Sequence, residues 1–129
     1  MAEMSNLQAI KEAALDFLHL TISGQIEEAY QKYVDMRGKH HNVYYPAEFS
    51  ALKQGMIENQ SQFPHKQFNV KHILAEGNLV GVHSNIVLTP GEPGISVVHI
   101  FRFEDGKIVE MWDVGQPVPA ASPNKEGAF

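Results

Sequence analysis

The chain has 129 residues, of which 43% are hydrophobic and 19% charged, and its formal net charge at pH 7 is −5. This size and composition predict one globular domain over residues 1–129, while the negative charge and the scattered Lys and Arg residues argue against nucleic-acid and acidic-membrane binding. The sequence contains no cysteine, which excludes disulfides, zinc–thiolate sites and cysteine nucleophiles.

The first half of the chain predicts three helices. Apolar residues at helical spacing indicate a long first helix that ends before Gly24, and a shorter second helix follows from Ile26. Residues 37–45 show no clear period and predict a loop or a short extended piece. Pro46 suits the first position of a third helix, which Pro64 ends. No stretch has the ~20 apolar residues of a membrane span or the apolar core of a signal peptide, so we expect a cytoplasmic protein.

From Phe68 onward the chain is rich in Val, Ile and Phe and predicts four consecutive antiparallel strands. Turn-forming residues at 76–78, 90–94 and 104–106 separate these strands. After Gln116, residues 117–129 are rich in Pro and small side chains and predict an extended C-terminal arm. Helices followed by a strand meander predict an α+β fold, in which helices cover the concave side of a twisted sheet and leave a cavity between the layers.

Two loops fit the hairpin between the last two strands. A two-residue Asp105-Gly106 turn would put Arg102 and Asp113 on one face. A three-residue loop with Gly106 in a bulge would instead oppose His99 to Met111, and we adopt it because it sorts the side chains better. Its inner face holds Val97, His99, Phe101, Phe103, Val109, Met111 and Asp113. Its outer face holds Val98, Ile100, Arg102, Ile108, Glu110 and Trp112.

Asp113 and His99 are the two polar side chains on this inner face, and as diagonal neighbours their Cβ atoms would lie about 7–8 Å apart or less. A carboxylate on an apolar wall is a stronger base than a solvated one, which suits a general base that removes a proton beside a carbonyl. His99 could donate a hydrogen bond to the substrate oxygen and return the proton. The alternative is that Asp113 is a turn residue and His99 a satisfied core residue.

The hairpin sequence also resembles a known family. Residues 97–119, VVHIFRFEDGKIVEMWDVGQPVP, closely resemble the last two strands of the SnoaL-like polyketide cyclases of the nuclear transport factor 2-like (NTF2-like) superfamily. The resemblance continues through residues 76–94 and 39–46, and it is closest to a bacterial branch of predicted SnoaL-like aldol-condensing enzymes. It implies a cone-shaped fold, usually dimeric, in which a curved antiparallel sheet and three N-terminal helices enclose a pocket.

The resemblance also implies roles for particular residues. In the characterised cyclases an Asp on the last strand acts as general base, and a His fourteen positions earlier assists it. These positions are Asp113 and His99 here. The implied reaction is an aldol ring closure without metal or organic cofactor. The antibiotic-pathway cyclases carry an amide two residues before the His, where this chain has Val97, and Asn42 or Gln116 could supply an amide instead.

The remaining candidates complete the expected site. Of the adjacent His40 and His41, at most one faces the cavity, and we favour His41. The predicted substrate-binding residues are therefore His41, Asn42, Val97, Phe101, Met111 and Gln116. A three-histidine metal site from His72, His83 and His99 lacks a supporting motif, so we expect neither metal nor cofactor.

Three functions stay open at this point. The first is an acid–base enzyme that acts on a small apolar or carbonyl-bearing molecule by aldol condensation, cyclisation or isomerisation. The second is non-catalytic binding of a small apolar ligand, and the third is a dimeric scaffold. Apolar residues on the outer hairpin face need cover, which either the C-terminal arm or, as we favour, a homodimer through this face would give.

Overall fold

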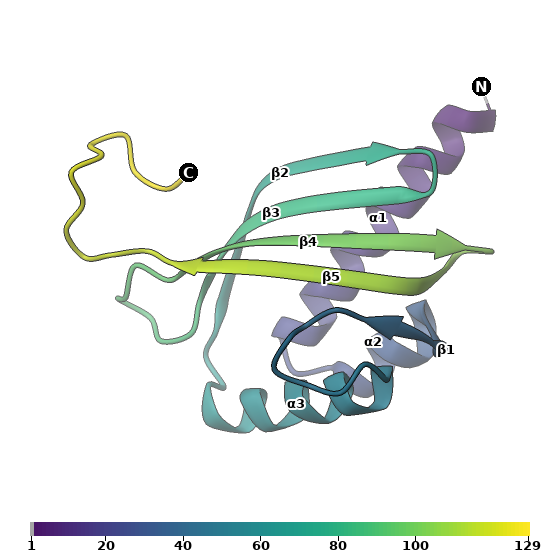
Figure 1. Ribbon diagram of the computed structural model, residues 1–129, viewed down its shortest axis with the longest axis horizontal. Helices are drawn as coiled ribbons and strands as arrows, with labels where there is room; N and C mark the ends of the chain where they lie inside the picture. Colours follow the sequence, from purple (N-terminus) through teal and green to yellow (C-terminus); the bar gives the residue numbers. More distant parts are fainter. Residues whose placement is uncertain (1) are drawn as a thin grey trace.

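The computed structural model describes the backbone of residues 2–129 and the side chains from residue 6 onward. Its elements form an α+β fold with one sheet and three helices (Figure 1). The helices are α1 (Ala2–Ile22), α2 (Ile26–Tyr33) and α3 (Phe49–Gln62). The strands are β1 (Val34–His40), β2 (Gln67–Glu76), β3 (Leu79–Val87), β4 (Ile95–Glu104) and β5 (Lys107–Pro117).

The strands lie in the order β1-β5-β4-β3-β2 in one curved sheet. Strands β2 to β5 form the antiparallel meander that the sequence predicts, and β1 adds to β5 in parallel. Helix α1 crosses one face of the meander, while α2 and α3 lie near β1, at the edge of the sheet opposite β2 (Figure 1). The sheet therefore has a helix-covered inner face and an outer face without helices.

For residues 37–45 we expected a loop or a short extended piece, because they show no alternation of apolar and polar side chains, and the structure has strand β1 over Val34–His40. The strand is defined instead by backbone pairing, which matches Val34 to Ile108 and His40 to Met111. The amide of His41 continues the pairing by donating to the Met111 carbonyl oxygen at 2.9 Å. A mostly polar edge strand of this kind carries little sequence signal.

The third helix begins at Phe49, three residues later than Pro46. The reason lies in the backbone before it. The carbonyl oxygen of Pro46 accepts a hydrogen bond from His40 Nε2 at 2.6 Å, and that of Ala47 accepts one from the His40 amide at 3.0 Å. These bonds keep Pro46 and Ala47 beside β1. The helix ends before Pro64, as predicted.

The hairpin between β4 and β5 has a different register from the one we adopted. Asp105 (φ 51°) and Gly106 (φ 76°) form a two-residue turn with both central residues left-handed. A bulge then intervenes, because Phe103 pairs with Ile108 but Arg102 pairs with Glu110. The predicted three-residue loop is therefore wrong.

The bulge has two consequences for the inner face. Ile108 is fully buried on this face, whereas the adopted register put it on the outer face and Val109 on the inner one. The extra residue also restores the alternation, so that Asp113 faces inward with Met111, as predicted. Asp113 pairs directly with His99 instead of lying diagonal to it, which brings the two Cβ atoms to about 4.5–5.5 Å.

The core fills the space between the inner face and the helices. Phe101 is fully buried at its centre and meets Phe17 edge to face at 5.8 Å. Phe17 packs in the same way on Tyr30. Burying one such side chain contributes about 1.5–3 kcal/mol. This packing fixes β4, and with it His99, against α1.

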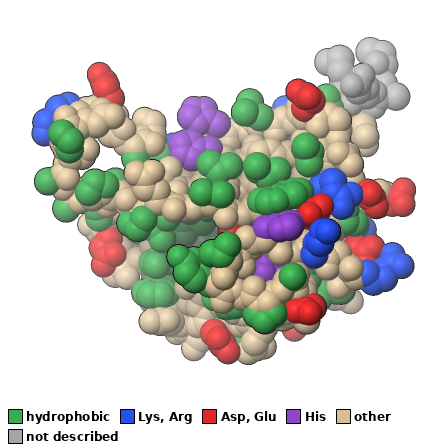
Figure 2. Space-filling view, viewed as in Figure 1, with side chains coloured by type: hydrophobic (Ala, Val, Ile, Leu, Met, Phe, Trp, Pro, Cys, Tyr) green, Lys and Arg blue, Asp and Glu red, His purple; other side chains and the backbone are tan. Residues whose placement is uncertain are grey.

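The outer face carries apolar side chains across its middle and charged ones mainly at its margins (Figure 2). Val98 and Ile100 are 38% and 37% exposed. The arm after β5 extends past the end of the sheet and turns back (Figure 1), and Phe129 packs 5.6 Å from the ring of His83 on β3. The arm thus leaves Val98 and Ile100 open, and the homodimer stays a prediction.

No helix within residues 2–129 is long and apolar enough to cross a membrane.

Candidate functional site

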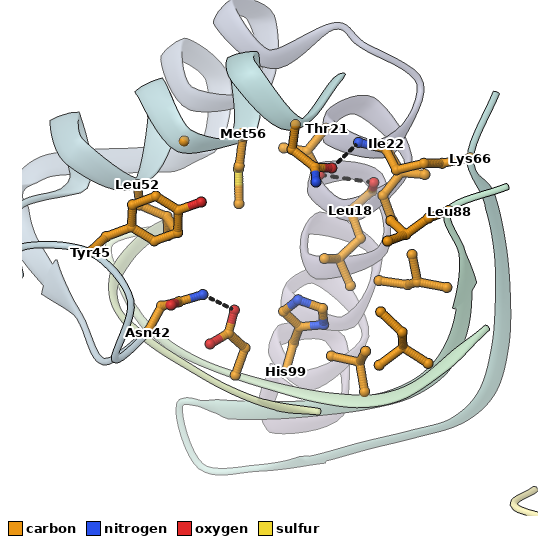
Figure 3. A pocket seen from close by; sticks show the side chains of 16 residues that line it. Leu18, Thr21, Ile22, Asn42, Tyr45, Leu52, Met56, Lys66, Leu88 and His99 are labelled. Carbon is orange, nitrogen blue, oxygen red and sulfur yellow. Dashed lines mark hydrogen bonds between the residues drawn. The ribbon is translucent and has the colours of Figure 1, made fainter. Parts of the chain in front are cut away.

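A cavity of about 290 Å³ opens between the inner face, α1, α3 and the segment before α3 (Figure 3). Its volume lies just below the usual range for ligand pockets, which is about 300–1,000 Å³. Most of its lining is apolar. The hydroxyl side chains of Thr21 and Tyr45 also line it, and the remaining polar side chains lie at two separate places. The lining residues are Leu18, Thr21, Ile22, Asn42, Tyr45, Leu52, Gly55, Met56, Asn59, Lys66, Ile86, Leu88, Ile95, Val97, His99 and Asp113.

His99 and Asp113 form the first polar place. His99 is 6% exposed, and burial lowers the pKa of its imidazole below the ordinary 6.5, while the nearby charge of Asp113 acts more weakly in the opposite direction. The imidazole is therefore neutral at pH 7. Its Nδ1 atom is buried and has no hydrogen-bond partner among the described residues. A ligand in the cavity would therefore use Nε2, which makes no hydrogen bond within the described residues either.

Asn42 holds the Asp113 carboxylate in place. Its Nδ2 donates to Asp113 Oδ2 at 3.0 Å, and its Oδ1 accepts from the Tyr44 amide at 3.0 Å (Figure 3). The backbone N–H of Asn42 donates to His40 Nδ1 at 3.1 Å. His40 therefore carries its proton on Nε2 and donates it to the Pro46 carbonyl oxygen. Both ends of the Asn42 side chain are fixed, and the donor end faces Asp113.

Tyr30 is a buried residue that contacts the cavity lining. Its hydroxyl donates to Met56 Sδ at 3.2 Å, and Met56 lines the cavity. Burial, and to a smaller extent the charge of Asp113, raise the pKa of Tyr30. The phenol therefore stays protonated and acts as a fixed donor to Met56. No pattern in the sequence indicates this contact of Tyr30 with a lining residue.

Lys66 and Asn59 form the second polar place. Lys66 lies between α3 and β2, and its Nζ donates to Asn59 Oδ1 at 2.7 Å. Burial lowers the pKa of Lys66. Figure 3 shows Lys66 and Asn42 on opposite sides of the cavity. Neither Lys66 nor Asn59 was predicted, because they follow no strand pattern and reach the cavity only through the packing of α3.

Four predicted site residues lie together at the cavity. His99, Asp113, Asn42 and Val97 all line it. Val97 stands beside His99 on the inner face and is 9% exposed, so this part of the wall is apolar where the antibiotic-pathway cyclases would place an amide. Asn42 supplies an amide from the other side of Asp113. The roles of these residues in binding or catalysis stay predictions.

The other four predicted substrate-binding residues lie elsewhere. Phe101 and Met111 are core residues behind the cavity wall, where Phe101 stacks on His99 at 5.9 Å. His41 lies on the outer side and stacks on Trp112 at 5.0 Å, because backbone alternation after β1 turns His40 inward. Gln116 is exposed, beyond the part of β5 that borders the cavity. These four placements were wrong.

The three histidines considered for a metal do not converge. The rings of His72 and His83 stack on the outer side at 5.2 Å, with their Nδ1 atoms 3.0 Å apart. His83 Nε2 is hydrogen-bonded to Ser96 Oγ at 2.9 Å. His99 lies on the inner face. Among the side chains of residues 6–129, no group of three or more His, Cys, Asp or Glu could hold a metal ion.

A cone of curved sheet over helices, with a cavity between them, defines the NTF2-like class of α+β proteins. Residues 15–111 match the SnoaL-like domain family, so the chain belongs to that family. The matched range includes His99 and ends two residues before Asp113. A search by sequence among proteins with curated descriptions finds no match.

Solved structures share the fold. AclR from Streptomyces galilaeus, a candidate hydroxylase, superposes with a TM-score of 0.73 at 21% identity, covering 85% of this chain and 90% of its own. A candidate polyketide cyclase from Acidithiobacillus ferrooxidans has a TM-score of 0.67 at 19% identity, with 84% and 88% covered. An NTF2-like protein of unknown function from Burkholderia xenovorans has a TM-score of 0.69 at 22% identity, with 90% and 88% covered. Such identities support the fold and leave the reaction open.

Proposed function

We propose that this protein is a cofactor-free acid–base enzyme that removes a proton beside the carbonyl group of a small substrate. Asp113 acts as the base, and His99 acts as the hydrogen-bond donor to the carbonyl oxygen. One observation carries the proposal: these two side chains oppose each other on neighbouring strands and line the same cavity. Two of the structural neighbours are candidate polyketide cyclases, which is consistent with it.

The chemistry uses the Asp113 carboxylate as proton acceptor and the neutral His99 imidazole as hydrogen-bond donor. A carboxylate oxygen of Asp113 takes the α-proton, the C–H electron pair moves into a C=C bond, and the carbonyl oxygen becomes an enolate oxygen. A neutral imidazole that donates its N–H stabilises this oxygen. In aldol cyclisation the enolate carbon then attacks a second carbonyl group, whose oxygen takes the proton from Asp113. In isomerisation the proton returns from Asp113 to another carbon.

The role of Asn42 in this scheme is positioning. Its amide donates to one carboxylate oxygen of Asp113, which leaves the other oxygen to receive the proton. Charge-assisted hydrogen bonds of this kind stabilise the anion and set its direction. The cavity of about 290 Å³ suits a small substrate with a mainly apolar body.

The test is hydrogen–deuterium exchange at the α-carbons of small diketones, followed by NMR. Loss of a positioned base costs about 10²- to 10⁴-fold in rate, so Asp113→Asn should reduce exchange by that factor. Gln116→Ala, on the same strand but outside the cavity, is the matched control and should keep the wild-type rate. Full exchange activity in Asp113→Asn would show that Asp113 is not the base.

A non-catalytic binding protein is the second candidate, and the apolar lining of the cavity favours it. In that case His99 and Asp113 serve only as polar contacts to the ligand. The wild-type protein would then bind small ketones without accelerating their exchange, and Asp113→Asn would change affinity alone. This outcome would contradict the enzymatic proposal and retain the site.

A further inference from the structure

The second polar place in the cavity has a chemistry of its own. We infer that Lys66 and Asn59 form a subsite for a carboxylate group, so that the ligand is an oxo acid with its carbonyl at Asp113 and His99 and its carboxylate at Lys66. The carboxylate subsite stands on its own observations. The oxo-acid identity rests also on the proposed function, which supplies the carbonyl end.

Lys66 is a cation that has no counter-ion among the side chains that the structure describes. It is half-buried at the cavity wall, and no carboxylate oxygen among the described residues lies within 4.0 Å of its Nζ. Removing an ammonium group from water is costly unless an opposite charge compensates. The lowered pKa of Lys66, which burial causes, reflects this cost. A bound anion would supply the missing charge.

Asn59 is oriented for the same ligand. Its Oδ1 accepts the hydrogen bond from Lys66, so its NH₂ group is left as a donor and has no partner among the described residues. The Lys66 ammonium likewise uses one of its three hydrogens on Asn59. This part of the wall therefore presents N–H donors from two side chains, which matches the two acceptor oxygens of a carboxylate.

The two polar places are separated by an apolar wall, and this separation sets the shape of the ligand. Asp113 lies on β5 and Lys66 immediately precedes β2, with β4 and β3 between them in the sheet. The wall between them is apolar and is formed by Ile86, Leu88, Ile95 and Val97. A ligand that fills the cavity therefore carries polar groups at both ends of an apolar body.

The binding test uses 4-phenylbutyrate and its neutral counterpart 4-phenyl-1-butanol, measured by titration calorimetry. A hydrogen bond to a charged group contributes about 1.5–3 kcal/mol, or roughly 10- to 100-fold in affinity, so the wild-type protein should prefer the acid by that factor. Lys66→Met should remove the preference and Lys66→Arg should keep it. Lys71→Met removes the same charge from a neighbouring part of β2, outside the cavity, and should also keep it.

Two results would overturn the subsite. One is equal affinity of the wild-type protein for the acid and the alcohol. The other is an acid preference that survives in Lys66→Met. Both readouts concern binding alone and need no turnover, so they are independent of whether Asp113 acts as a base.

A second measurement separates this inference from the proposed function. Oxo acids from 4-oxopentanoate to 8-oxononanoate are compared with their methyl esters in the exchange assay. Lys66→Met should raise KM for the acids by about 10- to 100-fold with little change in kcat. Exchange without preference for the acids would rule out the carboxylate subsite and support the proposed enzymatic function. A preference for 4-phenylbutyrate that depends on Lys66, without exchange of any oxo acid, would rule out the enzymatic function and support the subsite.

Discussion

Acid should destabilise this fold through His99. The buried imidazole has a lowered pKa in the folded protein, whereas in the unfolded chain it takes up a proton near pH 6.5. Below pH 6.5 the unfolded state therefore binds a proton that the folded state does not, and the free energy of unfolding falls as the pH falls. The slope approaches about 1.4 kcal/mol per pH unit, so lowering the pH to 5.0 should cost up to about 2 kcal/mol through this residue. The loss levels off below the pKa of the folded state.

Urea unfolding of the wild-type protein and His99→Gln between pH 5.0 and 7.5 measures this effect. The difference between the two curves of unfolding free energy against pH isolates the histidine, because other titrating groups are common to both. Asp113→Asn is a useful companion, since the charge of Asp113 raises the pKa of His99 and its removal should carry the decline to lower pH. Parallel curves for the wild-type protein and His99→Gln would refute the reasoning.

Two further predictions concern stability and are measured by thermal or denaturant unfolding. Phe101→Ala should cost about 3–5 kcal/mol, because it empties the centre of the core beside Phe17, and a loss below 1 kcal/mol would show that the core refills. Gly38→Ala should cost about 1–3 kcal/mol, because its Cβ would stand 2.1 Å from the Val109 carbonyl oxygen. Gly81→Ala, where a Cβ meets nothing within 4 Å, is the matched control, and equal losses in both variants would contradict the steric explanation.

The sequence was informative where side chains alternate between two environments. In the last hairpin, the alternation was sufficient to place His99 and Asp113 on one inner face. It was insufficient for the pairing, because a two-residue turn followed by a bulge and a three-residue loop give the same alternation over most of the hairpin. The two arrangements differ in which side chains face inward only near the turn, where Ile108 and Val109 exchange roles, although the cross-strand partners differ along the hairpin.

The sequence was uninformative where the backbone alone determines structure. Strand β1 is a polar segment that pairs in parallel with β5, and Gly38 permits its close approach to Val109. Without this strand, the inward and outward directions of His40 and His41 could not be assigned. The error at His41 therefore arises because the pairing of this extended segment with β5 was not predicted.

The cavity lining shows a similar division. Residues on the sheet, such as Val97, could be assigned from the hairpin pattern. Residues that reach the cavity from the helices and connections, such as Tyr45 and Lys66, depend on how α3 packs against the sheet. Packing of this kind involves contacts between segments far apart in the chain, and one sequence contains no local signal for it.

The order of the strands has a consequence for how the site forms. The Asn42–Asp113 hydrogen bond joins residues 71 positions apart, whereas the meander from β2 to β5 is made of neighbouring hairpins. Closing a long loop costs more entropy than closing a short one, and contacts of large sequence separation slow folding. We therefore expect the meander to assemble first and the β1 edge to dock onto it afterwards. Local opening of that edge would disconnect Asn42 from Asp113 while the rest of the sheet stays intact.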